Sequence, residues 1–221
     1  MRMLVSSLAL LAVVAFGVAA DDPPDGKNAP PAKKKAPPAK DDSPLQTGKD
    51  LPGPFHPYNV TGPHKQHFHC LVSDHGLDPM VMIFHKNVDF ADPLPNLLKK
   101  LDTAIDKNPA VRLGSFVVFL PEDLPEVVGS DDKNDDARNE VEKKVEQAGA
   151  DMKLKHVVLC LDSKADVEKY HLSDSNLVTI VLYKKFETVA VFALPQSEFT
   201  DAAIEKIMAA VGDKLGAKRQ K

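Results

Sequence analysis

The chain of 221 residues contains no tryptophan, only three tyrosines and only two cysteines. With so few aromatic side chains, a folded core has to be built mainly from aliphatic residues. Two cysteines are too few for a disulfide framework, so the protein must fold by burying apolar surface. A glycine-rich phosphate loop, a Ser/His/Asp arrangement and a catalytic pair of carboxylates are also missing from the sequence. The most familiar hydrolytic and phosphate-binding chemistries are therefore not indicated.

The charges are balanced and mixed along the chain. There are 28 lysines and arginines against 32 aspartates and glutamates, a formal net charge of −4. A nucleic-acid partner would require basic residues concentrated on one face, which this pattern does not suggest. We therefore expect no nucleic-acid binding.

Residues 1–20 have the pattern of a signal peptide. Arg2 is followed by an apolar run, Leu8–Phe16, and by small residues up to Ala20, after which we expect cleavage. The protein is then exported, to the periplasm or the medium. An uncleaved membrane anchor is the alternative. No later segment is apolar enough to span a bilayer, so no transmembrane span is expected after cleavage.

Residues 21–53 are dominated by proline, alanine, lysine and aspartate. The pentapeptide Ala29–Lys33 is repeated as Ala36–Lys40. Such a composition offers little apolar surface to offset the entropy lost on ordering, so it predicts a disordered linker with polyproline II character. The remaining residues, 54–221, have the length of a single domain.

Apolar patterns within this domain predict alternating strands and helices. Continuous apolar runs predict buried strands at Met80–Phe84, Phe116–Leu120 and Val157–Leu161, and two closely spaced runs predict a hairpin of Val178–Tyr183 and Thr188–Leu194. Helical spacing predicts helices over Leu94–Ile105, Ala137–Ala148 and Asp201–Leu215, the last capped by Thr200 and the second ended by Gly149.

This order predicts an α/β fold with a central mixed sheet of about five strands flanked by helices. Right-handed crossovers make the first three strands parallel, and the hairpin adds an antiparallel edge. We also expect Val81–Phe84 and Val157–Leu161 to be neighbours in this sheet.

The order is that of the thioredoxin fold, and three segments resemble one family in particular. Asn59–His64, His69–Ser73 and Gly76–Phe84 are similar to the start of a family of exported bacterial thioredoxin-like proteins. Members of that family carry Cys-Leu-Val-Cys where this chain has Cys70–Ser73. The similarity continues along most of the domain, through Leu97–Asp102, Phe116–Leu120 and Thr179–Tyr183. It implies a thioredoxin-like fold and no settled substrate.

Two departures from thioredoxin bear on redox function. Thioredoxin places its active cysteines where the first helix opens, and the equivalent residues here, Asn87–Asp92, contain none. Thioredoxin also has a cis-proline before the hairpin strand, where this chain has Val178. The standard dithiol site is therefore missing on both sides.

Cys70 and Ser73 are the candidate catalytic residues of a monothiol site. Ser73 can donate a hydrogen bond to the sulfur, and His69 or His75 can favour the thiolate, so that Cys70 could form mixed disulfides with a protein or a low-molecular-weight thiol. The alternatives are an inert cysteine or a disulfide with Cys160. We expect Cys160 to be buried in its strand and Cys70 to be partly exposed, so that the two do not pair.

Six of the eight histidines lie between His56 and His85. His67 and His69 would share one face of a strand, and His64, Cys70 and His75 could add ligands for zinc or copper. The spacing matches no stringent metal motif, and no other cofactor is indicated. The sequence thus predicts an exported thioredoxin-fold protein, either with weak or lost monothiol redox activity or retained as a binding module. The alternative is a histidine-rich metal-binding protein of the cell envelope.

Overall fold

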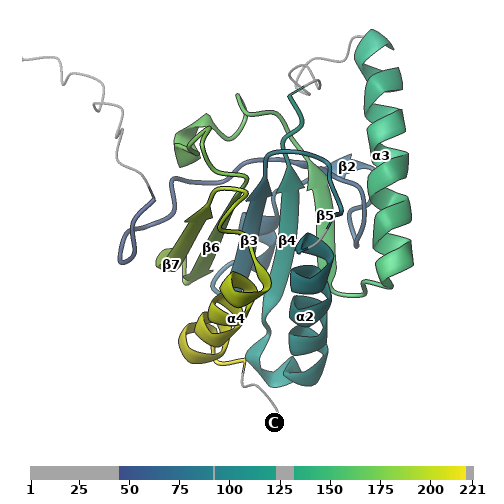
Figure 1. Ribbon diagram of the computed structural model, residues 1–221. Coiled ribbons are helices and arrows are strands. Elements are labelled where there is room, and N and C mark those ends of the chain that lie inside the picture. Colours follow the sequence, from purple (N-terminus) through teal and green to yellow (C-terminus); the bar gives the residue numbers. More distant parts are fainter. Residues whose placement is uncertain (1–44, 92, 123–131, 218–221) are drawn as a thin grey trace, which may run out of the picture. The chain divides into compact units, whose positions relative to one another are not determined.

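Seven strands form one mixed sheet in the computed structural model, which describes residues 45–91, 93–122 and 132–217 (Figure 1). The predicted signal peptide and the linker up to residue 44 lie outside the described residues. The order across the sheet is β2-β1-β5-β4-β3-β6-β7. The strands are β1 (Tyr58–Asn59), β2 (His67–Phe68), β3 (Met80–His85), β4 (Gly114–Phe119), β5 (Val157–Leu161), β6 (Val178–Lys184) and β7 (Glu187–Leu194).

The predicted α/β class and mixed sheet are confirmed, with two short strands that the sequence did not indicate. β3, β4 and β5 are parallel, and β6 and β7 form the antiparallel hairpin. The predicted adjacency of β3 and β5 is wrong, because β4 pairs with both of them. Each crossover places the next strand beside the one before it, so β4 separates β3 from β5. Antiparallel β1 and β2 extend the β5 side.

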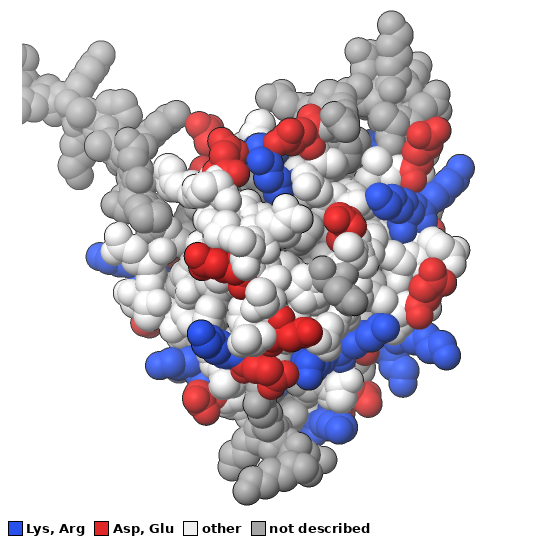
Figure 2. Space-filling model, in the orientation of Figure 1, with Lys and Arg blue, Asp and Glu red and all other residues white. Residues whose placement is uncertain are grey.

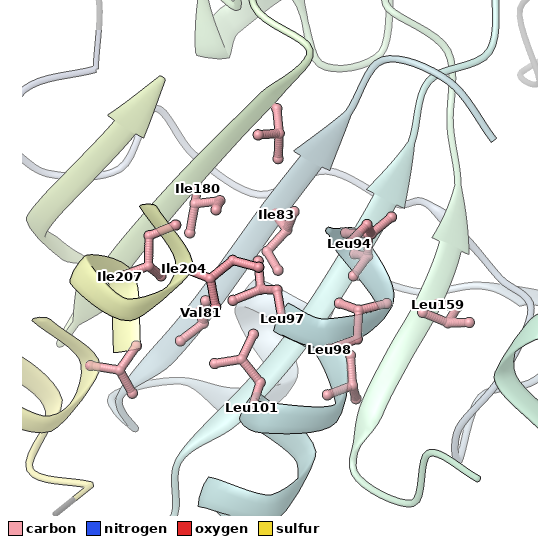
Figure 3. Packing of buried hydrophobic residues seen from close by; sticks show 14 of the residues in the cluster. Val81, Ile83, Leu94, Leu97, Leu98, Leu101, Leu159, Ile180, Ile204 and Ile207 are labelled. Carbon is pink, nitrogen blue, oxygen red and sulfur yellow. The ribbon is translucent and has the colours of Figure 1, made fainter. Parts of the chain in front are cut away.

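One face of the sheet is covered by α2 (Leu94–Lys107) and α4 (Asp201–Leu215), as Figures 1 and 3 show. Both predicted helices are confirmed, and Thr200 caps α4 by accepting a hydrogen bond from the Ala203 N–H at 3.3 Å. The leucines and isoleucines that face the sheet are at most 1% exposed: Leu94, Leu97, Leu98, Leu101, Ile204 and Ile207. Truncating one such leucine to alanine typically costs about 2–5 kcal/mol.

The helix α3 (Asp132–Met152) is longer than predicted. Gly149 does not end it. A Cβ at this position would lie 3.1 Å from the Leu159 side chain, so the glycine allows the helix to approach β5 closely. Among the described side chains of α3, Val145 is fully buried.

The opposite face of the sheet carries a second buried cluster. It contains alternate residues of the same strands together with Phe55, Tyr170 and residues of the short helix α1 (Leu71–His75). Because Met80 and Met82 belong to this cluster while Val81 and Ile83 belong to the first, α1 lies on the face away from α2 and α4.

Residues 45–53, which the composition assigns to the linker, are hydrogen-bonded to the hairpin. The Gly48 N–H donates to the Thr188 carbonyl at 2.7 Å, and the Leu51 N–H donates to the Phe186 carbonyl at 2.8 Å. Leu45 and Leu51 pack against the second cluster. Residues 45–51 therefore pack against the domain, although their composition resembles that of the linker.

Lysine and arginine side chains are interspersed with aspartates and glutamates on the α2–α4 face (Figure 2). Among the described residues, none of the helices combines the length and the apolarity needed to cross a bilayer.

Candidate functional site

Asn59 positions the segment that leads to Cys70. Its side-chain amide donates to the carbonyls of Pro57, His67 and His69 at 3.3, 3.1 and 3.3 Å, and its Oδ1 accepts from the Cys160 thiol at 3.1 Å. Asn59 is fully buried. Its side chain therefore fixes the backbone of β2 and of the residue that follows it from a site on the neighbouring strand.

Cys70 caps the start of α1. Its sulfur accepts hydrogen bonds from the Ser73 N–H at 3.4 Å and from the Ser73 hydroxyl at 3.2 Å. The two predicted site residues are thus in direct contact. These hydrogen bonds hold the cysteine in a fixed orientation at the first turn.

The expectation that Cys70 is partly exposed is wrong, since the residue is only 5% exposed. It belongs to the second buried cluster with Phe55 and Tyr170. Burial raises the pKa of Tyr170, and the nearby Cys70 charge contributes to the shift. Phe55 and Tyr170 are remote from Cys70 in the sequence, so a local pattern could not reveal that they enclose it.

Cys160 is fully buried in β5, as predicted, and both cysteines are free. Burial raises the pKa of the Cys160 thiol well above its usual range, and the Asp162 carboxylate adds to this effect. The expectation that the two cysteines do not pair is confirmed. Cys70 therefore has no resolving thiol within this chain, because the sequence contains no third cysteine.

Two of the four predicted histidine ligands come together. The rings of His64 and His69 are stacked with their centroids 3.5 Å apart, and Asp74 on α1 approaches both of them. The other two predicted ligands, His67 and His75, are not part of this cluster. Nδ1 of His67 contacts the Lys65 carbonyl at 2.8 Å, and burial lowers the pKa of His75.

A buried histidine stands at the end of β3, just before the segment that leads to α2. His85 ends β3 and is 2% exposed, and its Nδ1 lies 2.5 Å from the Asn87 carbonyl oxygen. Burial lowers the pKa of His85. Its side chain is thus held by the backbone that leads to α2.

A second buried ionisable group follows β5. Asp162 is 1% exposed, and its Oδ1 accepts from the Ser163 N–H at 2.9 Å, whereas no donor faces its Oδ2. Burial, with a smaller contribution from the neighbouring Asp166 carboxyl, raises the pKa of Asp162 to about 8. A proton on Asp162 can satisfy both carboxyl groups, which explains how an otherwise unpaired oxygen is tolerated here.

A cavity of about 300 Å³ lies at the carboxyl ends of β3 and β4. It was not predicted from the sequence, because most of its wall comes from the irregular segment between β5 and β6. Its apolar lining residues are Phe84, Leu120, Val167, Leu172 and Leu177. Its polar and charged lining residues are Lys86, Lys164, Glu168, His171, Ser173, Asp174, Asn176 and Thr179. No thiol is among them.

The lysines at this cavity are already paired. Lys164 contacts Asp174 at 2.9 Å and Glu122 at 3.5 Å, while Lys86 contacts Glu122 at 3.3 Å. Lys86 lowers the pKa of Glu122, and Lys164 lowers that of Asp174. The cavity thus combines an apolar interior with a rim whose opposite charges are balanced against each other.

No family model and no curated protein sequence matches the chain. Among solved structures it is similar to a protein from Chlorobium tepidum assigned as a thiol:disulfide interchange protein, DsbE. The identity is 16%, the TM-score is 0.52, and the match covers 78% of this chain and 99% of that chain. It is also similar to peroxidoxin BcpB from Mycobacterium tuberculosis, at 14% identity and a TM-score of 0.51, covering 80% of this chain and 99% of that chain.

A third similar structure is a yeast mitochondrial 1-Cys peroxiredoxin, at 12% identity and a TM-score of 0.51, with 78% of this chain and 79% of that chain covered. At these identities the similarities establish the thioredoxin-like fold and nothing finer. The predicted fold class is confirmed.

Proposed function

We propose that the protein is an exported thioredoxin-fold binding module that holds an apolar side chain of an extended peptide and does not exchange disulfides. The observation that carries this proposal is the 300 Å³ cavity at the carboxyl ends of β3 and β4, which has an apolar interior and no thiol. In open α/β sheets, ligands usually bind at the carboxyl ends of the strands. Export is proposed from the signal pattern of residues 1–20, and residues 21–44 would serve as a spacer.

The balanced rim favours a peptide over a strongly charged small molecule. Lys86 and Lys164 have their acidic partners within the protein, so an anionic ligand would have to displace an ion pair in order to bind them. Burying a leucine-sized side chain contributes about 1.5–3 kcal/mol, which suits a weak, reversible complex. The name of the Chlorobium tepidum protein points to thiol chemistry, but the positions that would support such chemistry lack cysteine here.

The absence of tryptophan provides a clean assay for peptide binding. A Ser173→Trp variant places a single indole at an exposed position on the rim. We expect a saturable change in its fluorescence with an octapeptide of alternating leucine and serine. The same peptide with alanine in place of leucine should bind much more weakly, because it leaves the cavity unfilled.

Leu172→Glu in this background should weaken binding about tenfold, the equivalent of about 1.4 kcal/mol, by placing a charge in the apolar wall. Leu77→Glu is the matched control, because Leu77 is 62% exposed and is not a lining residue. Equal binding of both peptides, or equal loss in both variants, would refute recognition through this cavity. Loss of binding in Cys70→Ser would show that it depends on the thiol.

The contact between Cys70 and Ser73 provides a separate test of redox function. We expect the wild-type protein to reduce insulin no faster than a Cys70→Ser control, because its sulfur is buried and has no resolving partner. Ser73→Cys places a thiol within reach of Cys70 but leaves it enclosed, so turnover should remain at background. A clear gain of reductase activity in Ser73→Cys would support the monothiol function instead.

A further inference from the structure

We propose that His64, His69 and Asp74 form a zinc-binding site. One ligand atom from each of the three residues lies within 4.8 Å of the other two. They occur at intervals of five residues, in the pattern His-x₄-His-x₄-Asp. None of them lines the cavity described above, so this site is independent of the proposed peptide binding.

The distances are close to those that a metal ion requires. Asp74 Oδ2 lies 3.4 Å from His64 Nε2, and Asp74 Oδ1 lies 3.7 Å from His69 Nε2. Ligands that bind zinc tetrahedrally at 2.0–2.2 Å are about 3.3–3.5 Å from one another. With one ligand atom from each residue the three lie within 4.8 Å of one another, so side-chain rotations that move these atoms by about 1 Å would bring them to the spacing of zinc ligands.

His69 supplies the second observation. Its Nε2 is shielded from solvent and has no hydrogen-bond partner. A buried polar atom without a partner is costly. A metal ion between His69 and Asp74 would satisfy this nitrogen. The His64 ring is stacked on the His69 ring with the centroids 3.5 Å apart, so the His64 side chain would have to turn before its nitrogen could reach the same ion.

The backbone holds the three ligands in place. The His69 N–H donates to the Pro57 carbonyl at 3.2 Å, and its own carbonyl accepts from the Asn59 side chain. The Asp74 N–H donates to the Cys70 carbonyl at 3.0 Å within α1. The loop that carries His64 is tied to α3 by an ion pair between Lys65 and Glu146 at 2.5 Å. The backbone that carries the three ligands would therefore need little further ordering when zinc binds.

Three protein ligands leave a fourth tetrahedral position for water or a second molecule. The side chains of His64 and His69 are 35% exposed and that of Asp74 is 41% exposed, so solvent can reach the site. Imidazole and carboxylate ligands suit zinc, whereas copper(II) prefers a square arrangement that this compact cluster does not provide.

The test uses the full chain after treatment with a chelator. Calorimetric titration with zinc chloride should show one equivalent bound, and cobalt(II) should give the visible absorption of a tetrahedral site. His69→Ala should weaken zinc binding by about a hundredfold or more, since it removes a direct ligand. His64→Ala and Asp74→Asn each remove a different ligand, and neither residue contributes an unpartnered buried atom as His69 does, so they test the site even if His69→Ala fails to fold.

His67→Ala is the matched control, because His67 lies in the same segment and is exposed, yet contacts only the Lys65 carbonyl through its ring. It should retain wild-type affinity. The proposal is overturned if wild-type protein binds no stoichiometric zinc, if all variants bind alike, or if His67→Ala loses as much affinity as His64→Ala.

Discussion

Replacing Asp102 with alanine is expected to lower the free energy of unfolding by about 3 kcal/mol. Oδ1 of this nearly buried carboxylate accepts the backbone N–H groups of Lys155, His156 and Val157 at 2.9, 2.7 and 3.1 Å. Hydrogen bonds to a charged acceptor are worth about 1.5–3 kcal/mol each, and they are not additive. Alanine would leave three donors at the entry to β5 without their acceptor. Urea unfolding monitored by circular dichroism measures the loss.

The matched control is Asp106→Ala on the same helix. Asp106 contacts the His156 ring at 3.1 Å, but its side chain is 60% exposed, so the pair contributes little. This variant should change stability by less than about 0.5 kcal/mol. Asp102→Asn keeps one acceptor oxygen without the charge, so its loss should be intermediate. Equal losses at positions 102 and 106 would contradict the role assigned to Asp102.

The second large effect is a pH-dependent one at Asp162. Burial and the Asp166 carboxyl raise the pKa of Asp162 in the folded protein to about 8, from about 3.9 in an unfolded chain. Between these values the unfolded chain releases a proton that the folded protein retains. The contribution of Asp162 to stability is therefore fully present below about pH 4 and is lost progressively as the pH rises toward 8.

Asp162→Asn removes this titration. At pH 7.5 the variant should be more stable than the wild type by roughly 4 kcal/mol, and near pH 4 the two should be about equal. The comparison also cancels the opposite trend from His75 and His85, whose pKa values are lowered by burial. Unfolding midpoints measured from pH 4 to pH 8 give the difference directly. Parallel curves for the two proteins would show that Asp162 is not buried as a neutral acid.

The strands and helices that form the core were predictable, because apolar runs and helical spacing can be recognised within short stretches of the sequence. The apolar runs that form β3 and β5 could be recognised at once, as could the helical spacing of Leu94, Leu97 and Leu101. The short strands β1 and β2 have two residues each and no pattern to detect. β1 depends on its pairing with β5, about a hundred residues later, and β2 depends on its pairing with β1, which a sequence does not display.

The candidate site was predictable only in part. The hydrogen bond from Ser73 to Cys70 follows from their spacing at the start of a helix, but the burial of Cys70 depends on Tyr170, a hundred positions later in the chain. The sequence indicated His64 and His69, yet it missed Asp74, because an aspartate in an exposed helix has many structural uses. The cavity was missed altogether, because irregular segments carry no periodicity.

The pairing of residues 48–51 with the hairpin affects how the domain can be isolated. The isolated bridge between Asp50 and Glu187 and the flanking hydrogen bonds cover one end of β7, the last strand of the sheet. A shortened protein that begins at residue 54, where the composition changes, would lose this cover together with the packing of Leu51. Its uncovered strand edge would then offer unpaired peptide groups to other molecules, a recognised route to aggregation. A shortened protein that keeps this cover and both leucine contacts therefore has to include Leu45.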